Sequence, residues 1–327
     1  MSSSTPCGPS YRYEPLDASV GSIRLLTILP HLSGTGLIQC KIWHDTVDAT
    51  YTCLSYAWGS EDGEQLILLN GNEFRVRKNL WDFMKTAKQK YADQPRSFWI
   101  DALSIDQESR TERNHQVAQM GLVYSNGVEV ISWLGLDQRI CRAIKMILPP
   151  SPYYTAFCKG EGFKIWDQLN PQLPGQLKRD WLAVTRADYW MRAWITQEIY
   201  LARKVILLVD NVEIEATYMS RMAPFLGHIN ELEGDKWLKP EYWDTDTRVF
   251  FTYLYAFANK APTKLRLIDF FNLLPGRVCE HPRDRVYSLL ALASDTNGIT
   301  VDYNGPISDV VLQLLRTYRT TMFRHGT

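Results

Sequence analysis

The chain has 327 residues, of which 45% are apolar and 12% aromatic, so it can bury one large core or two modest ones. Lysine and arginine together number 36, and so do aspartate and glutamate. This balance gives the chain no net charge, which removes the simplest argument for binding nucleic acid or an anionic membrane.

The cysteines are too widely spaced to suggest a metal site or a redox motif. No two of them form a C-x-x-C pair, and His115, His228 and His281 do not complete a metal-ligand spacing. We therefore predict no bound metal and reduced thiols, as is usual in the cytosol, at Cys7, Cys40, Cys53, Cys141, Cys158 and Cys279.

The first twenty residues carry no targeting signal. Met1–Ser10 is polar and lacks an apolar run, and no stretch of the chain approaches the ~20 apolar residues that a membrane-crossing helix needs. We expect residues 1–20 to be a flexible leader on a cytoplasmic protein without a membrane span.

The first predicted elements are strands. Ile23–Leu29 and Leu37–Trp43 are rich in leucine and β-branched residues and flank a glycine-containing turn, which predicts an N-terminal β-hairpin. Tyr51–Trp58 is a further strand. Asn70-Gly71, between two short apolar runs, is a strong local signal for a second hairpin.

Helices and strands then alternate. The patterns predict a helix from Asn79 to about Tyr91, a strand over Ser97–Leu103, a helix from the Ser109–Glu112 capping box to Asn126-Gly127, and a strand over Val128–Leu134. Short links between alternating strands and helices imply right-handed crossovers, so we predict an α/β fold with a mainly parallel central sheet flanked by helices.

The second half of the sequence is less regular. Residues 136–180 contain several prolines and are predicted to form an insertion or a lid. Tyr189–Ala202 is predicted as one helix and Val205–Val209 as a strand, followed by mostly helical additions. A helix-like segment, Ile307–Met322, leads us to treat residues 306–327 as the start of a C-terminal helical extension. The predicted core includes Trp99, Ile100, Val117, Met120, Trp133 and Trp194.

Seven blocks in order resemble the fungal heterokaryon-incompatibility (HET) domain family, from about residue 13 to residue 305. They are Tyr13–Leu16 with Ile23–Leu26, Leu54–Gly59, Asn79-Leu80, Phe98–Ala102 with Ile105–Gln107 and Glu112–Tyr124, Trp133–Gly135, Trp190–Glu198 and Arg283–Tyr287. The resemblance implies that residues 21–305 form a HET domain. It also implies an intracellular role in heterokaryon incompatibility, programmed cell death and fungal innate immunity.

The central block departs from the family pattern at two positions. Ser104-Ile105-Asp106-Gln107 stands where the family usually has Cys-Ile-Asn-Gln. The missing cysteine argues against thiol chemistry at position 104, and the charge of Asp106 sets this chain apart from the family at that position.

HET domains are in turn distantly similar to Toll/interleukin-1 receptor (TIR) domains, which implies a TIR- or flavodoxin-like core. Several TIR domains cleave NAD with a glutamate in a helix, and Glu198 lies four residues after Trp194 in the helix that corresponds. The resemblance therefore points to a hydrolase that uses NAD as substrate and needs no other cofactor.

Glu198 is the candidate catalytic residue. In one continuous helix, Trp190, Trp194, Glu198 and Ala202 would form a single apolar stripe, and a carboxylate on such a stripe must be paired or functional. A fixed negative charge there stabilises the oxocarbenium character that builds up when a ribose–nicotinamide bond breaks. The alternative is a structural ion pair with Arg192 or Arg203.

The turn after the Tyr51–Trp58 strand is the candidate binding site, because open α/β sheets place ligands at the carboxyl ends of strands. The turn contributes Ser55, Tyr56, Trp58, Gly59 and Ser60. We also assign Asp101 and Trp194, from other segments, to ligand binding. Tyr56 and Trp58 either stack on a ligand ring or pack in the core. Asp101 either holds a ribose or a metal ion, or bonds locally in its turn.

Other charged residues are interpreted as structural. We read Glu112 and Arg113 as a solvated pair on a helix, and Arg283-Asp284-Arg285 as a salt-bridge cluster that ties distant segments together. His115 is read as a surface or core residue, and no Ser-His-Asp constellation can be assembled.

Two functions fit these observations. One is a TIR-like NAD nucleosidase whose activity is triggered by assembly. The other is a non-catalytic death-signalling module that acts by self-association or by recruiting a receptor or another protein of the same pathway. Nucleic acid is not expected as a partner.

Overall fold

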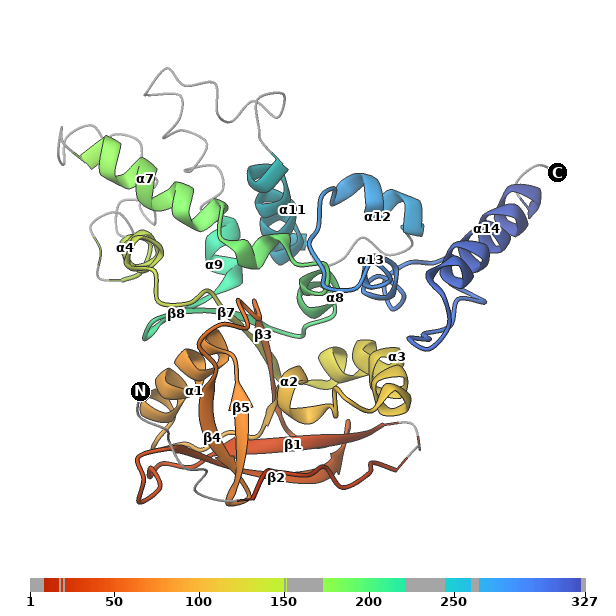
Figure 1. The fold of residues 1–327 in the computed structure, drawn as a ribbon. Helices are drawn as coiled ribbons and strands as arrows, with labels where there is room; N and C mark the ends of the chain where they lie inside the picture. Colours follow the sequence, from red (N-terminus) through yellow and green to blue (C-terminus); the bar gives the residue numbers. More distant parts are fainter. Residues whose placement is uncertain are drawn as a thin grey trace.

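The computed structural model describes residues 9–17, 19, 21–149, 151, 173–221, 245–259 and 265–324. A nine-stranded sheet with helices on both faces forms the body of the protein (Figure 1). In chain order its strands are β1 (Ser22–Ile28), β2 (Ile38–Thr46), β3 (Thr52–Tyr56), β4 (Gln65–Leu69), β5 (Asn72–Val76), β6 (Phe98–Trp99), β7 (Glu129–Trp133), β8 (Val205–Val209) and β9 (Val212–Glu215).

The helices are mostly short. The described ones are α1 (Lys78–Lys90), α2 (Asp101–Ser104), α3 (Arg110–Asn126), α4 (Gln138–Met146), α7 (Leu173–Thr185), the 3₁₀ helix η1 (Asp188–Met191), α8 (Ile195–Tyr200), α9 (Ala216–Arg221), α11 (Thr245–Asn259), α12 (Leu267–Leu273), α13 (Asp284–Tyr287) and α14 (Ile307–Arg324). None of these helices has the length and apolar character needed to cross a membrane.

The sheet is mixed, which corrects the prediction of a mainly parallel sheet. Its strand order is β5-β4-β2-β1-β6-β3-β7-β8-β9. The four strands predicted to form the core, β6, β3, β7 and β8, do lie side by side in parallel. Among the other described strands, β2 and β4 pair in parallel, whereas the two hairpins, the contact of β1 with β6 and the return strand β9 add antiparallel pairs.

Both predicted hairpins are confirmed. β1 and β2 pair antiparallel, and β4 and β5 join through Asn70 and Gly71, whose positive φ angles of 49° and 83° suit a tight hairpin turn. A third hairpin, β8 to β9, was not predicted. It turns at Asp210, which has a φ of 50°, and the alternation of Val212 and Ile214 with glutamates was its signal in the sequence.

One predicted strand ends earlier than expected, and the predicted insertion is partly helical. The strand predicted over Ser97–Leu103 stops at Trp99, because the short helix α2 starts at Asp101. Within the predicted insertion, α4 and the start of α7 are helical, and residues 152–172 lie outside the described residues. So do residues 1–8, 18 and 20 of the predicted leader.

The helix predicted over Tyr189–Ala202 is broken into η1 and α8. The break occurs where Arg192 forms an isolated parallel bridge with Val278. Ala193 N donates to Val278 O at 2.9 Å, and Val278 N donates to Met191 O at 2.6 Å. These bonds use backbone groups that a continuous helix would need, so Trp190 and Glu198 do not share one stripe.

The sheet separates the core into layers. Helix α1 packs on one face of the sheet, against side chains such as Leu54 and Ile131. Helix α3 packs on the other face, against Cys53 and Val130, and α8 joins it on that side through Ile199 and its neighbours. Of the predicted core residues, Trp99, Ile100, Val117, Met120 and Trp133 are buried and Trp194 is half-buried.

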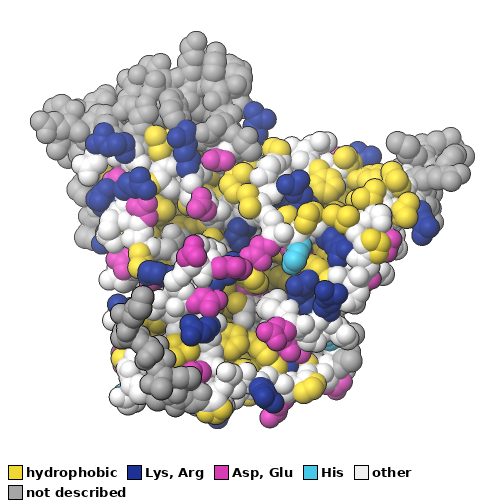
Figure 2. Space-filling view, in the orientation of Figure 1, with side chains coloured by type: hydrophobic (Ala, Val, Ile, Leu, Met, Phe, Trp, Pro, Cys, Tyr) yellow, Lys and Arg dark blue, Asp and Glu magenta, His cyan; other side chains and the backbone are white. Residues whose placement is uncertain are grey.

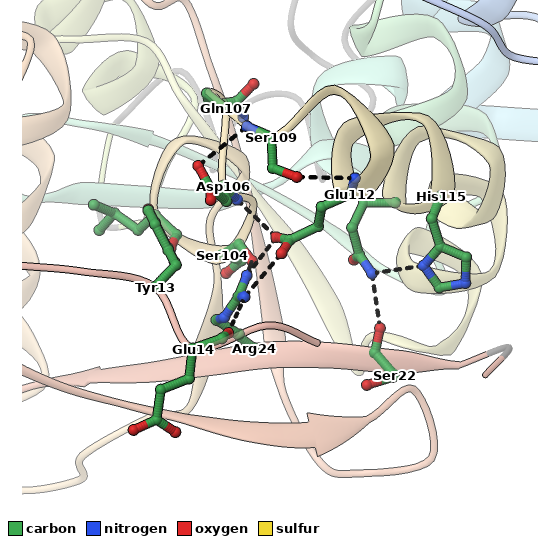
Figure 3. Close-up of polar contacts among 12 residues, drawn as sticks. Tyr13, Glu14, Ser22, Arg24, Ser104, Asp106, Gln107, Ser109, Glu112 and His115 are labelled. Atoms are coloured by element: carbon green, nitrogen blue, oxygen red, sulfur yellow. Dashed lines mark hydrogen bonds and ion pairs between the residues drawn. The ribbon is translucent and has the colours of Figure 1, made fainter. Parts of the chain in front are cut away.

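A buried ion pair between β1 and α3 ties the N-terminal hairpin to the parallel block (Figure 3). Arg24, only 1% exposed, donates to both carboxylate oxygens of Glu112, with Nη2 to Oε2 at 2.9 Å. It also donates to the carbonyl oxygens of Ser104 and Glu14. Glu112 is therefore not the solvated residue that we predicted.

The same carboxylate shapes the loop before α3. Asp106 N donates to Glu112 Oε1 at 2.7 Å, and Ser109 Oγ accepts from Glu112 N at 3.3 Å. Ser109 thus caps the helix as predicted, but the Glu112 side chain bonds Arg24 and Asp106 instead of completing the capping box (Figure 3).

Replacing Glu112 with Gln should lower the free energy of unfolding by ~3–5 kcal/mol, because it leaves the Arg24 guanidinium buried without a countercharge. Urea denaturation measures the change. Glu108→Gln, an exposed change in the same loop, is the matched control and should stay within about 0.5 kcal/mol of the wild type. Equal stabilities of the two variants would show that the ion pair contributes nothing.

Candidate functional site

The carboxyl end of β3 lies where consecutive crossovers leave in opposite directions. From β3 the chain passes through β4, β5 and α1 to β6 on one side, and from β6 it passes through α2 and α3 to β7 on the other side of β3. Because α1 and α3 also cover opposite faces, the loops after β3, β6 and β7 splay apart, which is where open α/β sheets bind ligands.

The turn after β3 is held by Asn79 and Arg77. Asn79 Nδ2 donates to Ala57 O at 2.5 Å, and its Oδ1 accepts from Trp133 Nε1 at 2.9 Å. Arg77 donates to Gly59 O at 3.0 Å and lies 5.0 Å from the centre of the Trp58 ring. Gly59 has a φ of 76°, a conformation that favours glycine.

A cavity of about 680 Å³ opens beside this turn. Its walls come from the β3 turn, the start of α2, α3, the η1–α8 break and the segment around α13, and they include Trp58, Asp101, Arg113, Arg192, Trp194 and Tyr303. Acidic and basic side chains gather across the middle of the face shown in Figure 2, where the surface is indented. A second cavity of about 810 Å³ lies on the other side of Gly59, against α4 and α7.

Glu198 lies behind the wall of the first cavity. It is 1% exposed and accepts a hydrogen bond from Ser55 Oγ. Ser55 Oγ contacts Tyr189 OH at 2.7 Å, and Tyr189 OH contacts Ser132 Oγ at 2.7 Å, so a chain of hydroxyl groups leads from β7 to the carboxylate.

Arg192 lines the cavity and separates Glu198 from it. Its Nη1 lies 3.6 Å from Glu198 Oε2, and its charge also acts on Asp101. This contact is the ion pair that we gave as the structural alternative. Arg203, the other candidate partner, instead donates to Ser125 O at 2.8 Å.

Burial raises the pKa of Glu198 to about 7, and Arg192 and the Ser55 hydrogen bond offset only part of that effect. Burial likewise raises the pKa of Asp101, against the lowering effect of Arg192 and of the Trp58 hydrogen bond. Glu198 can therefore exchange a proton near neutral pH, as a general acid or base must.

Trp58 and Asp101, two of the predicted binding residues, are joined by a hydrogen bond. Trp58 Nε1 donates to Asp101 Oδ2 at 2.8 Å, and both residues line the cavity. Asp101 Oδ1 also accepts from Ala102 N at 2.7 Å, so its local bonding and its place in the cavity wall coexist. Trp194 lines the same cavity.

The other residues of the predicted turn lie in different surroundings, because successive side chains of a strand point to opposite faces of the sheet. Ser55 points to the face of α8 and bonds Glu198, whereas Tyr56 is buried on the α1 face. Gly59 borders both cavities. Ser60 is exposed and bonds Asp62.

Arg113 is a site residue that sequence reasoning missed. It lines the cavity with its guanidinium carbon 3.9 Å from the centre of the Tyr303 ring, although we read it as solvated. The signal was its spacing, because Arg113, Val117 and Met120 follow at i, i+4 and i+7 and so share the apolar face of α3.

The Arg283-Asp284-Arg285 segment ties distant parts together without an ion pair among the described residues, contrary to prediction. Tyr303 OH donates to Asp284 Oδ1 at 2.5 Å, and Arg283 donates to Gly305 O. His115 is half-buried on α3 and contacts its neighbour Gln116 (Figure 3).

The described cysteines, Cys40, Cys53, Cys141 and Cys279, are free thiols. Within the described ranges, no group of three or more histidine, cysteine, aspartate or glutamate side chains is placed to hold a metal ion.

The fold and this cleft define the class: a mixed α/β domain with a ligand-sized cavity at the carboxyl ends of its parallel strands. Residues 51–198, which include β3, Asp101, Arg192 and Glu198, match the family model described as heterokaryon incompatibility protein (HET). This central segment of the chain is therefore similar to the HET family.

A curated relative from Neurospora crassa is named heterokaryon incompatibility protein 6, OR allele. It is 23% identical over 346 aligned residues, which cover 86% of this chain and 49% of the relative. The chain thus spans about half the length of that relative. No solved structure matches the chain significantly.

The raised pKa of Glu198 predicts a pH dependence of stability. Between the pKa of a free glutamate, near 4.5, and about 7, the folded protein holds a proton that the unfolded chain releases. Glu198 should therefore lower the free energy of unfolding as pH rises through this window. Glu198→Gln, which cannot titrate, should gain stability relative to the wild type from pH 4.5 to 7.5, as followed by urea denaturation. A constant difference between the two proteins would contradict the raised pKa.

Proposed function

We propose that this chain is the effector domain of a heterokaryon-incompatibility response and that it causes cell death by cleaving NAD. The family match and the name of the Neurospora relative support the biological role. The TIR-like resemblance of the sequence supports the choice of substrate. The observation that carries the chemistry is a buried carboxylate, Glu198, with a pKa near 7 behind the wall of a cavity at the carboxyl ends of β3 and β6.

The reaction is hydrolysis of the bond between ribose and nicotinamide. The bonding electrons leave with the nicotinamide ring nitrogen, and the ribose carbon becomes oxocarbenium-like and takes up the oxygen of water. The products are nicotinamide, ADP-ribose and a proton. In this proposal an ionised Glu198 stabilises the positive ribose, Asp101 binds ribose hydroxyls and Trp58 stacks on a ring, which is supported by the position of Asp101 and Trp58 on the cavity wall.

In the described structure Arg192 neutralises Glu198 and separates it from the cavity. Activity therefore requires the Arg192 side chain to move. Its Nη1 is buried and has no hydrogen-bond acceptor among the described residues, so the 3.6 Å contact with Glu198 is the constraint that must be released. A trigger such as assembly can act on this contact through the η1–α8 break.

Purified, concentrated wild-type protein should release nicotinamide from NAD, and Glu198→Gln should abolish the release. The variant keeps the size and hydrogen-bonding reach of glutamate but loses the charge. Glu198→Asp keeps the charge and should retain part of the activity. Thermal melting shows that each variant is folded. A folded Glu198→Gln protein that still releases nicotinamide and kills cells would falsify the catalytic assignment.

The second candidate is a non-catalytic module that signals death by self-association. It is favoured by the full burial of Glu198, which its pairing with Arg192 and its bond from Ser55 already explain structurally. Helix α14, which extends from the body in Figure 1, exposes Val311, Leu312 and Leu315, a surface that a second copy can cover.

If the module acts through α14, Leu315→Asp should shift the protein toward the monomer in sedimentation and stop cell death, because a charge in an apolar interface is costly. Leu32→Asp, the same substitution at an exposed leucine outside α14, is the control. Unchanged sedimentation and killing by Leu315→Asp would rule out this surface.

A further inference from the structure

Two arginines on the walls of the cavity beside Trp58 have buried N–H groups without acceptors. Arg113 Nε on α3 and Arg192 Nη1 at the η1–α8 break are both inaccessible to solvent, and neither finds a hydrogen-bond partner among the described residues. Buried donors are nearly always satisfied in native proteins. Arg192 Nη1 has only the 3.6 Å ion pair with Glu198, and Arg113 Nε has no acceptor among the described residues, so either group gains a hydrogen bond when its side chain turns toward a ligand in the cavity.

The setting of Arg113 keeps its charge within the cavity wall. The guanidinium carbon lies over the Tyr303 ring, 3.9 Å from its centre, and Tyr303 OH in turn donates to Asp284 at 2.5 Å. The ring and this hydrogen bond fix the plane of the arginine, because a guanidinium stacks on an aromatic face.

Three of the four acidic residues that line the cavity accept hydrogen bonds within the protein, and the fourth, Asp188, is exposed. Asp101 accepts from Trp58 and from Ala102 N, and Glu280 accepts from Arg77 at 2.8 Å. Burial raises the pKa of Asp101 and of Asp284. Asp101, Glu280 and Asp284 bond other groups, so the Arg113 guanidinium on the cavity wall remains available to an anion.

We propose that Arg113 and Arg192 form an anion subsite that binds the diphosphate of a dinucleotide. The proposal rests on the proposed function for the nature of the ligand, and it goes further by assigning the residues that hold the phosphates. Phosphate oxygens accept well from planar guanidinium groups, and Trp58 and Trp194 on the same cavity supply faces for the rings that a dinucleotide carries.

The test is calorimetric binding of ADP-ribose and of inorganic pyrophosphate to the full chain. Wild-type protein should bind ADP-ribose, and Arg113→Gln should weaken the binding of both probes about tenfold or more, since one charge-assisted hydrogen bond is lost. Arg113→Lys keeps the charge but lacks the Nε–H and should also weaken binding. Arg203→Gln, at an exposed arginine that bonds Ser125 O, is the matched control and should bind like the wild type.

The outcomes separate this subsite from the proposed reaction. If ADP-ribose binds in an Arg113-dependent way but no nicotinamide is released from NAD, the subsite stands and the nucleosidase proposal fails. If nicotinamide is released and Arg113→Gln leaves KM unchanged, the reaction stands and the subsite is overturned. Wild-type protein that binds neither probe also overturns the subsite. If Arg113→Gln does not fold, Arg113→Lys decides, and unchanged binding by that variant overturns the subsite.

Discussion

The buried ion pair between Arg24 and Glu112 is the interaction on which the site's geometry depends. Arg24 belongs to the antiparallel hairpin, whereas Glu112 starts the helix that packs on the parallel block. Because Glu112 also accepts from Asp106 N, the pair fixes the loop that runs from Asp101 to α3. A buried pair of this kind adds little net stability compared with apolar packing, so its main effect is to specify one arrangement of the two parts.

Glu198 illustrates a balance between stability and reactivity. A carboxylate with a pKa near 7 is destabilised in its charged form by burial, and Arg192 and the Ser55 hydroxyl offset only part of that cost. An arrangement optimised for stability alone would replace the glutamate with an apolar side chain. The Glu198 carboxylate, which Arg192 holds in place, therefore fits the proposed role in which its ionised form acts on a ligand.

The sequence patterns predicted the elements that depend on residues close together in the chain. Asn70-Gly71 predicted its hairpin, and the strand–helix alternation predicted β3, β7 and β8 as strands of one sheet, where they pair in parallel. Trp58, Asp101 and Trp194, which the sequence assigned to ligand binding, line one cavity, but the sequence did not assign Arg113 to it. It failed at the Tyr189–Ala202 helix, because the break is made by backbone bonds to Val278, and no local pattern reports a partner so far along the chain. The mixed character of the sheet escaped prediction for a related reason, since the hairpins add to its edges through long-range pairing.

The bridge between Arg192 and Val278 also bears on where the functional unit ends. The family match covers residues 51–198, yet the backbone groups that turn Arg192 toward Glu198 are paired with a residue beyond it, and Tyr303, which supports Arg113, lies further still. Arg24 lies before the matched segment. A fragment trimmed to the matched boundaries would keep Glu198 but lose the contacts that aim the two arginines. The smallest piece of this chain that preserves the cavity therefore extends from β1 to Tyr303.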